Sequence, residues 1–281
     1  MRINTNISSL TAQEAAQNTG KSVTGSLEKL STGLRINKAS DDASGLAIAD
    51  KLRTQATSIN QGISNGNSAV ALLQIADKSM SEQSNILDTV KAKLIQANTD
   101  TTSDDGRESI RKDINKLLTQ LDNIAAQTNY NGTSLLQAGP ATATSSTGLK
   151  FQIGEKAGDI ISNSAIRANT DGLVLTTLKG FGANALTKTA AAAQQGSIDT
   201  AITKLNGYRG DIGSTQNQVE SAVRNLMTQA TNVKAAESII RDVDYAAESA
   251  NFNKQNIISQ AGSYAISQAN AVQQNVLRLL Q

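Results

Sequence analysis

The side chains that most often perform catalysis or bind metals are missing from this chain of 281 residues, which contains no histidine and no cysteine. Their absence removes thiolate nucleophiles, the commonest general base and the commonest metal ligand. Aspartate, glutamate, lysine and tyrosine could still support catalysis. The composition nevertheless favours a protein that is not an enzyme and holds no metal or cofactor.

Acidic residues stand where helices are expected to begin. Asp41 and Asp42 come directly before a run of small residues, 43–49, and Asp104 or Asp105 lies in the polar break 100–106. A carboxylate at the start of a helix accepts hydrogen bonds from the first free backbone amides. We therefore expect these residues to act as N-caps.

The charges are balanced and mixed along the chain. Lys and Arg total 26 against 24 Asp and Glu, so no basic surface for nucleic acid or an anionic membrane is indicated. No apolar run reaches the roughly 18 residues that a membrane-spanning helix needs. The N-terminus also lacks the pattern of a cleaved secretory signal. We expect no nucleic-acid binding and no membrane insertion.

Apolar residues recur every three or four positions over most of the chain, which predicts long amphipathic helices. One such stretch covers 5–35, where the apolar line passes through Ala12 and Ala16. A second covers about 59–97, a third begins near residue 104, and a fourth covers 198–240. The second stretch has a core position every seven residues, at Gly66, Leu73, Met80, Leu87 and Leu94.

The helical periodicity stops between residues 133 and 178, which contain Gly139-Pro140, a Ser/Thr tract and short apolar runs. Residues 149–153 alternate apolar and polar side chains, and 160–161 and 173–175 are further short runs. This is the pattern of one or two β-hairpins. The fold class predicted is therefore mainly α: an elongated antiparallel helical bundle or coiled coil, with paired N- and C-terminal helices and a small β-hairpin region at the far end.

Two domains are expected from this organisation. Residues 1–44 with 239–281 form a terminal helical domain, and 45–238 form a helical bundle domain that includes the β region. Apolar stripes continue almost to both ends of the chain, as far as Ile3 and Leu280. We expect the N- and C-terminal stripes to cover each other, and other copies of the chain to cover any apolar surface that the two helices leave bare.

Six sequence blocks carry a resemblance to a known family. They are 1–6 (MRINTN), 27–37 (LEKLSTGLRIN), 39–49 (ASDDASGLAIA), 127–132 (QTNYNG), 242–248 (DVDYAAE) and 275–280 (NVLRLL). In these blocks the chain resembles bacterial flagellin, in a short form that lacks large outer domains. The resemblance implies a structural subunit that self-polymerises into the flagellar filament for motility.

The resemblance also implies partners and a location. The partners would be other copies of the chain, a flagellar export chaperone, the filament cap and hook-associated proteins. Export through the flagellar type III channel would place the protein in the extracellular filament without a cleaved signal. The Ser/Thr tract 142–147 is a candidate for O-linked sugars, as in some flagellins, although at any one residue the sequence favours an unmodified loop.

The candidate subunit interface combines the terminal stripes with the polar segment after the first helix. Asp41 and Asp42, with Arg35 and Lys38 nearby, are expected either to cap the next helix or to form polar contacts between subunits. The interface residues predicted are Ile3, Ile7, Leu10, Leu27, Leu30, Leu34, Arg35, Asp41, Asp42, Ile258, Val272, Val276 and Leu280.

A receptor contact of the family is altered in this sequence. Flagellins that activate the vertebrate Toll-like receptor carry an Arg-x-Arg-Glu-Leu cluster, and the matching positions here are Thr89, Lys91, Ala92 and Lys93. The planar guanidinium and the apolar anchor are both replaced. We expect weak or no receptor activation. Neutral surface drift would give the same sequence.

Two other functions are compatible with the pattern. A hook-filament junction protein resembles flagellin at both ends, but it matches less well in residues 39–49 and in the last six residues. A secreted helical adhesin or effector would need an exposed binding surface in the β region. No aromatic cluster is present there to form one.

Overall fold

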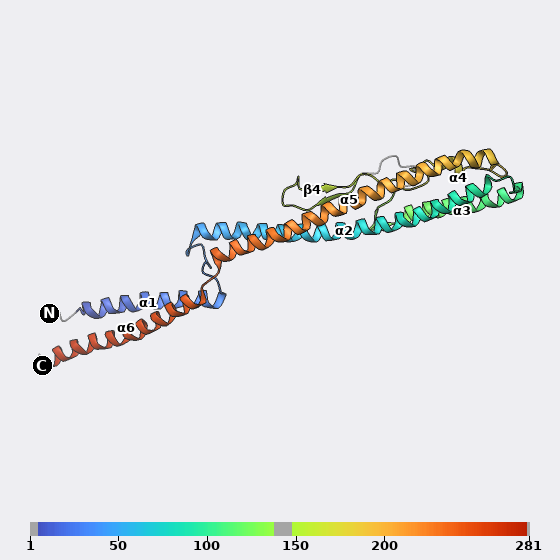
Figure 1. The fold of residues 1–281 in the computed structure, drawn as a ribbon. Coiled ribbons are helices and arrows are strands. Elements are labelled where there is room, and N and C mark those ends of the chain that lie inside the picture. The colour runs from blue at the N-terminus through green and yellow to red at the C-terminus, as the bar shows by residue number, and fades with distance from the viewer. Residues whose placement is uncertain (1–4, 138–147, 280–281) are drawn as a thin grey trace. The chain divides into compact units, whose positions relative to one another are not determined.

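The computed structural model is mainly α-helical, as predicted, and describes residues 5–137 and 148–279 (Figure 1). Ile3, Leu280 and the Ser/Thr tract 142–147 lie outside these ranges. The helices are α1 (Ile7–Thr32), α2 (Ala43–Ala97), α3 (Asp104–Gln127), α4 (Thr176–Lys179), α5 (Lys188–Arg241) and α6 (Tyr245–Leu279). The strands are β1 (Asn129–Tyr130), β2 (Thr133–Ser134), β3 (Lys150–Gln152) and β4 (Ile160–Ser162).

The chain divides into two compact units. The terminal unit comprises Met1–Ala56 and Thr231–Gln281, and the central unit comprises Thr57–Ala230. Helices α2 and α5 contribute residues to both units. The predicted domain boundaries, after residues 44 and 238, also fall within these two helices. The separate folding of the two predicted domains stays a prediction.

In the terminal unit, α1 and α6 lie side by side and antiparallel, which confirms the predicted pairing (Figure 1). Asn6 Nδ2 donates to the carbonyl oxygen of Ala269 (3.1 Å), and Asn251 Nδ2 donates to Ser26 Oγ (3.2 Å). Small side chains bring the helices close, since a Cβ added at Gly262 would lie 3.7 Å from the Cβ of Ala16. The α1 side of this seam consists of Ser9, Ala12, Ala16, Thr19, Val23, Ser26 and Leu30, all buried or half-buried.

The two loops that lead into this pair are joined to each other. Helix α1 ends at Gly33, whose left-handed φ of 73° suits a residue without a side chain. Leu34 then forms an isolated antiparallel bridge with Asp242. The N–H of Arg35 donates to the carbonyl oxygen of Arg241 (2.7 Å), and the N–H of Val243 donates to that of Gly33 (3.0 Å). These bonds set where α1 ends and α6 begins.

The central unit is built on α2, α3 and α5, which enclose a main apolar core, and a second, smaller apolar cluster lies around Ile153, Val219 and Val223. The predicted positions of α2 are confirmed, since Leu73, Met80, Leu87 and Leu94 are fully buried. Burial of each such side chain contributes roughly 1.5–3 kcal/mol. The predicted cap of α3 is wrong, because the Oγ of Ser103 accepts from the N–H of Gly106 (3.2 Å), while the two aspartates occupy the first turn.

The predicted small β region of one or two hairpins is confirmed, as two antiparallel pairs of short strands, β1 with β2 and β3 with β4. The apolar run 173–175 is not a strand. It forms a turn in which Val174 has a φ of 62°, while Leu173 and Leu175 are buried in the core. The turn is held by a hydrogen bond from the N–H of Leu175 to the carbonyl oxygen of Thr170 (2.8 Å).

The predicted place of the β region at the tip of the bundle is also wrong. The β3–β4 pair packs along the side of the central unit, where Asn65 Nδ2 donates to the carbonyl oxygen of Gln152 (3.0 Å). The carbonyl oxygen of Ile153 occupies the place that a Cβ at Gly62 would take. The tip is instead formed by the turn between α2 and α3, which the Lys188–Asp100 ion pair (2.7 Å) joins to the start of α5.

Candidate subunit interface

Helix α6 presents a partly buried face to α1 and two exposed faces to the outside. The residues of this seam recur every three or four positions and are all partly buried: Phe252, Gln255, Ser259, Gly262, Ile266, Ala269 and Gln273. This seam is mostly small or polar, so it uses little of the apolar content of the helix. Most of the large apolar side chains of α6 are therefore left outside the pair.

The predicted C-terminal stripe is mostly this uncovered surface. Ile258, Ala261, Ala265 and Val272 are all exposed, and only Ala269 lies in the seam. The expectation that this stripe covers the N-terminal helix is therefore wrong for most of its described members. The side chain of Val276 lies outside the described part of the chain.

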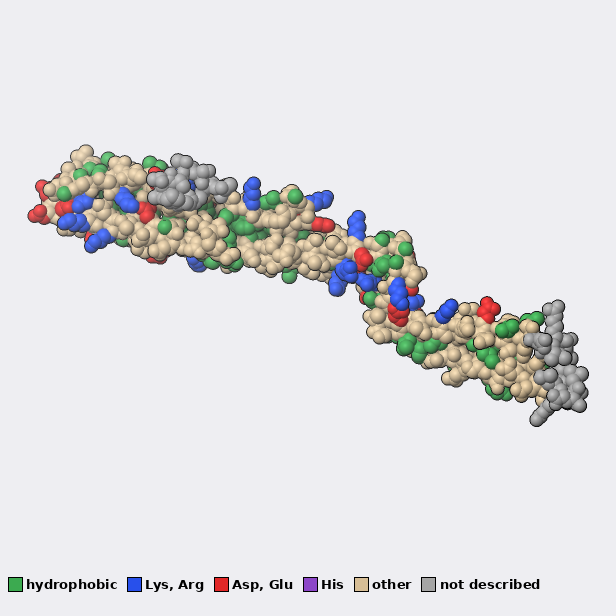
Figure 2. Space-filling model, turned by 180° about the vertical axis from the view of Figure 1, so that it is seen from behind, with side chains coloured by type: hydrophobic (Ala, Val, Ile, Leu, Met, Phe, Trp, Pro, Cys, Tyr) green, Lys and Arg blue, Asp and Glu red, His purple; other side chains and the backbone are tan. Residues whose placement is uncertain are grey.

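The exposed residues of α6 form an apolar face with unusually large side chains for a surface. Ile257 is 66% exposed, Tyr264 is 75% exposed, and Ile258 and Val272 are also exposed. Figure 2 shows hydrophobic side chains at the surface of the terminal unit. Contiguous apolar surface of this kind marks a site of protein interaction.

The remaining face of α6 is polar but almost uncharged. Between residues 249 and 277 the only charged side chain is Lys254. Asparagine, glutamine and serine supply the polar positions, among them Asn253, Gln260, Ser267 and Asn270, all exposed. Without charges, this face favours neither repulsion nor strong attraction between neighbouring copies of the helix.

Helix α1 contributes fewer apolar side chains to the exterior. Ile7, Leu10 and Leu27 are more than half exposed, whereas Leu30 and Leu34 are half-buried within the terminal unit. Of the predicted interface residues on α1, Ile7, Leu10 and Leu27 are therefore available to a partner. Leu30 and Leu34 contribute mainly to the fold of the subunit itself.

The polar segment after α1 is hydrogen-bonded within its own chain. Asp42 Oδ1 accepts from the N–H of Gly45 (2.8 Å), which confirms that Asp42 caps α2. Asp41 does not cap α2. Its Oδ2 accepts from the N–H groups of Lys38 and Asn37 (3.0 Å each), and these bonds lower the pKa of Asp41 below its ordinary value.

The basic residues of this segment also have intrachain partners. Arg35 donates to the carbonyl oxygen of Ile240 (2.6 Å), and Lys38 Nζ pairs with Glu28 Oε2 (2.7 Å). The hydrogen bond to Glu28, helped by its charge, raises the pKa of Lys38. Polar contacts between subunits through Arg35, Asp41 and Asp42 stay a prediction.

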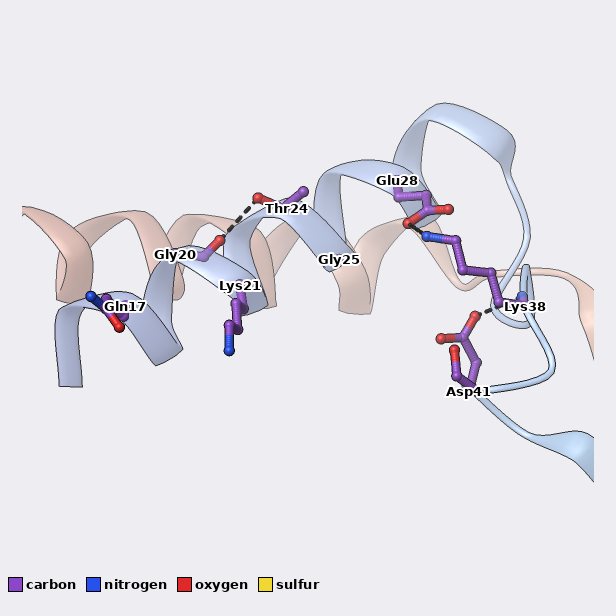
Figure 3. Close-up of a pocket in the computed structure, with 9 residues that line it drawn as sticks. Gln17, Gly20, Lys21, Thr24, Gly25, Glu28, Lys38 and Asp41 are labelled. Atoms are coloured by element: carbon purple, nitrogen blue, oxygen red, sulfur yellow. Dashed lines mark hydrogen bonds and ion pairs between the residues drawn. The ribbon is translucent and has the colours of Figure 1, made fainter. Parts of the chain in front are cut away.

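An open groove of about 640 Å³ runs along α1 beside this segment. Gly20, Lys21 and Gly25 lie on the helix side, and Lys38 and Asp41 lie on the loop side (Figure 3). Nothing lies within 4 Å of a Cβ built at either glycine. The groove is shallow and mixed in polarity, so it has the character of a contact surface and not of a small-molecule pocket.

In the central unit, the four predicted receptor-contact positions are placed on α2, and two of them form ion pairs with neighbouring helices. Lys91 Nζ pairs with Asp199 Oδ1 of α5 (2.5 Å), and Lys93 Nζ pairs with Asp113 Oδ2 of α3 (2.9 Å). Thr89 Oγ1 donates to a carbonyl oxygen of its own helix (2.9 Å), and Ala92 is exposed. Neither ion pair was predicted from the sequence.

The described residues contain no group of three or more acidic, His or Cys side chains placed to hold a metal ion. Within the same ranges, no helix is both long enough and apolar enough to cross a bilayer.

Comparison with known proteins assigns both helical halves to one family. Residues 3–140 match the bacterial flagellin N-terminal helical region, and 196–280 match the bacterial flagellin C-terminal helical region. The chain is 35% identical to a flagellin of Bacillus subtilis (strain 168) over 303 residues, covering all of both chains. It is 34% identical to a flagellar filament 30.7 kDa core protein of Treponema maltophilum, again over both full chains.

Solved structures agree with this assignment. The crystal structure of Bacillus cereus flagellin is 30% identical, with a TM-score of 0.50 over 62% of this chain and 94% of that chain. A putative flagellar hook-associated protein from Vibrio parahaemolyticus has a TM-score of 0.58 at 14% identity, covering 72% and 99%, which shows a shared fold. The alignment with flagellin A of Helicobacter pylori spans 507 positions, so the 281-residue chain is a short form. The chain therefore belongs to the bacterial flagellin family, and it is a structural subunit of the flagellar filament.

Proposed function

We propose that this flagellin polymerises through the outer faces of α1 and α6, which neighbouring copies of the chain cover. The observation that carries the proposal is the exposed apolar face of α6, formed by Ile257, Ile258, Tyr264 and Val272. The α1–α6 pair leaves it bare because the seam between them is built from small residues. A contact between two different faces of identical subunits builds a helical filament when its rotation does not close into a ring.

The small area buried between α1 and α6 also fits assembly at the growing end of the flagellum. Ordering a residue costs about 1–2 kcal/mol of backbone entropy, and a two-helix pair with a small-residue seam buries little surface to offset it. The terminal helices would thus order fully only when neighbouring copies cover them. A chain that stays loose at its ends suits passage through the flagellar export channel and addition under the filament cap.

Family resemblance supports the remaining partners. These are an export chaperone that protects the apolar terminal helix before secretion, and hook-associated proteins at the base of the filament. We also propose weak or absent activation of the Toll-like receptor for flagellin. The support is the replacement of the activating cluster by Thr89, Lys91, Ala92 and Lys93, whose lysines pair with Asp199 and Asp113. Full-strength signalling from purified monomer in a reporter-cell assay would contradict this.

Charge placed on one face of α6 tests the assembly surface. Ile258→Asp and Val272→Asp put a carboxylate on the apolar face, and Gln260→Asp puts the same charge on the exposed polar face of the same helix. We expect the first two to abolish filaments that sediment and are visible by electron microscopy, and Gln260→Asp to retain them. Equal filament yield from all three variants would refute the proposed surface.

The central unit serves as the internal control for these variants. Its core does not include α6, so its thermal unfolding followed by circular dichroism should be the same in every variant. A hook-filament junction protein or a secreted adhesin would remain short or monomeric under conditions in which a flagellin grows long filaments. Electron microscopy of the unmodified protein therefore separates these alternatives.

A further inference from the structure

The sequence contains three Asn-Gly pairs, of which two lie in helices and one lies in a hairpin loop. Asn65-Gly66 lies inside α2 and Asn206-Gly207 lies inside α5. Asn131-Gly132 is different, because it forms the two-residue loop between β1 and β2. Asn131 and Gly132 both have positive φ values, 49° and 80°, as a type I′ hairpin turn requires.

We propose that Asn131 is a site of spontaneous deamidation, which converts it to a mixture of aspartate and isoaspartate. The backbone nitrogen of Gly132 attacks the Asn131 side-chain carbonyl carbon, forming a carbon–nitrogen bond and a five-membered succinimide. The bond to Nδ2 breaks, and the amide nitrogen leaves as ammonia with the proton lost from Gly132. Water then opens the ring at either carbonyl, so no other reactant is needed.

The exposure of Asn131 makes this loop accessible to the reaction. Both loop residues are exposed, and the Asn131 side chain has no hydrogen-bond partner within the described ranges. Nothing lies within 4 Å of a Cβ built at Gly132, so no other element packs on the side-chain face of this glycine. Water and base reach both reacting atoms.

The hairpin is also short enough to open easily. Each of its strands has two residues, with Tyr130 opposite Thr133 and Asn129 opposite Ser134. A two-stranded hairpin of this length has little stability of its own. Local opening frees the ψ angle of Asn131, which must change before the Gly132 nitrogen can reach the side chain.

The two helical pairs are protected by their backbones. The N–H groups of Gly66 and Gly207 point along the axes of helices of 55 and 54 residues, where the hydrogen-bond ladder holds them. Asn65 is held further, since its Oδ1 accepts from Gln61 (2.9 Å) and its Nδ2 donates to Gln152. Asn206 is exposed like Asn131 but lies in a helix. A difference in deamidation rate between these two residues therefore reports the effect of the backbone conformation and not that of exposure.

Isoaspartate would change the hairpin itself. It routes the main chain through the side-chain carbon and so lengthens a two-residue loop whose geometry sets the register of its strands. The adjoining Leu135 and Leu136 are buried in the core, and Tyr130 packs against it. The damage is thus expected to loosen this corner of the central unit and to leave the helices intact.

Peptide mass spectrometry of the aged full-length protein tests the proposal. The purified protein is incubated in mildly alkaline buffer, and the acid form is quantified over time at Asn65, Asn131 and Asn206. We expect the rate at Asn131 to exceed that at either helical site by roughly tenfold or more, because helix interiors open far less often than a short exposed hairpin. The isoaspartate fraction is identified by its altered chromatographic retention.

Two controls keep the outcome decisive. In denaturant the three Asn-Gly pairs should react at similar rates, since the backbone difference is then gone. The Asn131→Gly variant keeps a residue that tolerates positive φ and should lose the reaction at this loop alone. Equal rates at Asn131 and Asn206 in the folded protein would overturn the proposal. So would a folded protein in which Asn131 stays intact over a time in which Asn131 of the denatured protein has reacted.

Discussion

Lys91 of α2 and Asp199 of α5 form an ion pair of 2.5 Å, and this contact joins helices whose paired residues lie 108 positions apart in the sequence. Both side chains are partly exposed, so solvent screens the pair. Lys93 makes a second such contact, with Asp113 of α3. The two lysines at positions that match the receptor contact of the family therefore link α2 to α5 and to α3.

Lys91→Ala should lower the free energy of unfolding of the central unit by no more than about 1 kcal/mol, because exposed ion pairs contribute little. Charge reversal by Lys91→Asp should cost more, since it sets two carboxylates together. The double variant Lys91→Asp with Asp199→Lys should recover most of that loss. Denaturant unfolding of the monomer measures all four proteins, and a double variant no more stable than Lys91→Asp would show that the pair is not formed.

Acid should weaken the contact between α3 and the segment before α5 through Glu108. The side chain of Arg111, followed by the N–H of Asn184, lowers the pKa of Glu108 from 4.5 to about 2. A lowered pKa in the folded state means that the stabilisation is present above pH 4.5 and is lost as the pH falls towards 2. Glu108→Gln should thus be less stable than the unmodified protein at neutral pH and differ little from it near pH 2.

Thermal unfolding as a function of pH measures this difference. Glu155→Gln is the control, because Glu155 is exposed and takes part in no ion pair among the described residues. Its unfolding temperature should follow that of the unmodified protein at every pH. A Glu108→Gln deficit that stays constant down to pH 2 would mean that packing, and not the charge, is responsible.

Two helical glycines of the central unit should respond in opposite ways to alanine. At Gly62 the new methyl group would meet the carbonyl oxygen of Ile153, which cannot move without displacing the β3–β4 pair. We expect a loss of about 1–3 kcal/mol, typical of overpacking. At Gly207 nothing lies within 4 Å, so alanine should add up to about 1 kcal/mol through helix propensity.

Denaturant unfolding of monomers decides between these effects. If Gly62→Ala were as stable as Gly207→Ala, the hairpin would not be packed on α2 as described. If Gly207→Ala were instead destabilising, helix propensity could not be the property that governs this exposed position.

Asp42 offers a test of capping against contact between subunits. Asp42→Ala removes the acceptor for the N–H of Gly45 and should cost about 1 kcal/mol, together with a reduced filament yield. Asp42→Asn keeps an oxygen acceptor and removes only the charge. If the charge contacts a neighbouring subunit, Asp42→Asn will also assemble poorly while the monomer unfolds normally.

Filament yield and monomer unfolding measured side by side separate the two roles. Normal assembly of Asp42→Asn would restrict this residue to its cap. A monomer of Asp42→Ala that is unchanged in stability would contradict the cap.

Local periodicity explains which parts of the fold could be predicted. The buried series from Leu73 to Leu94 follows from a seven-residue spacing that any helical partner would satisfy. The Lys91–Asp199 pair could not be predicted, because it depends on the register between two helices. The start of α2 at Ala43 was predicted from its capping residue Asp42 and not from a stripe, since the small and polar residues that follow show no clear apolar periodicity.

For the candidate interface too, the sequence identified the residues but not the helix face on which they meet a partner. The apolar stripe through Ile258 and Val272 was visible in the sequence, but it could not reveal which face meets α1. The structure uses the small residues around Gly262 for that contact, because they let two backbones approach closely. Hydrophobicity alone therefore predicted the wrong seam while selecting residues that remain available for assembly.

Removal of residues 255–281 should abolish polymerisation and leave the central unit folded. The deletion takes away most of α6 and all of its exposed apolar side chains from Ile257 onward, whereas the central unit spans Thr57–Ala230 and has its own core. We expect cooperative thermal unfolding close to that of the full-length monomer, and no sedimentable filament at any concentration that polymerises the full chain. Deletion of the β3–β4 loop residues 155–158 is the matched control, because it shortens an exposed turn and spares the terminal unit. Filaments from the C-terminal truncation would show that subunits associate through the central unit alone, and the apolar face of α6 would then need another partner.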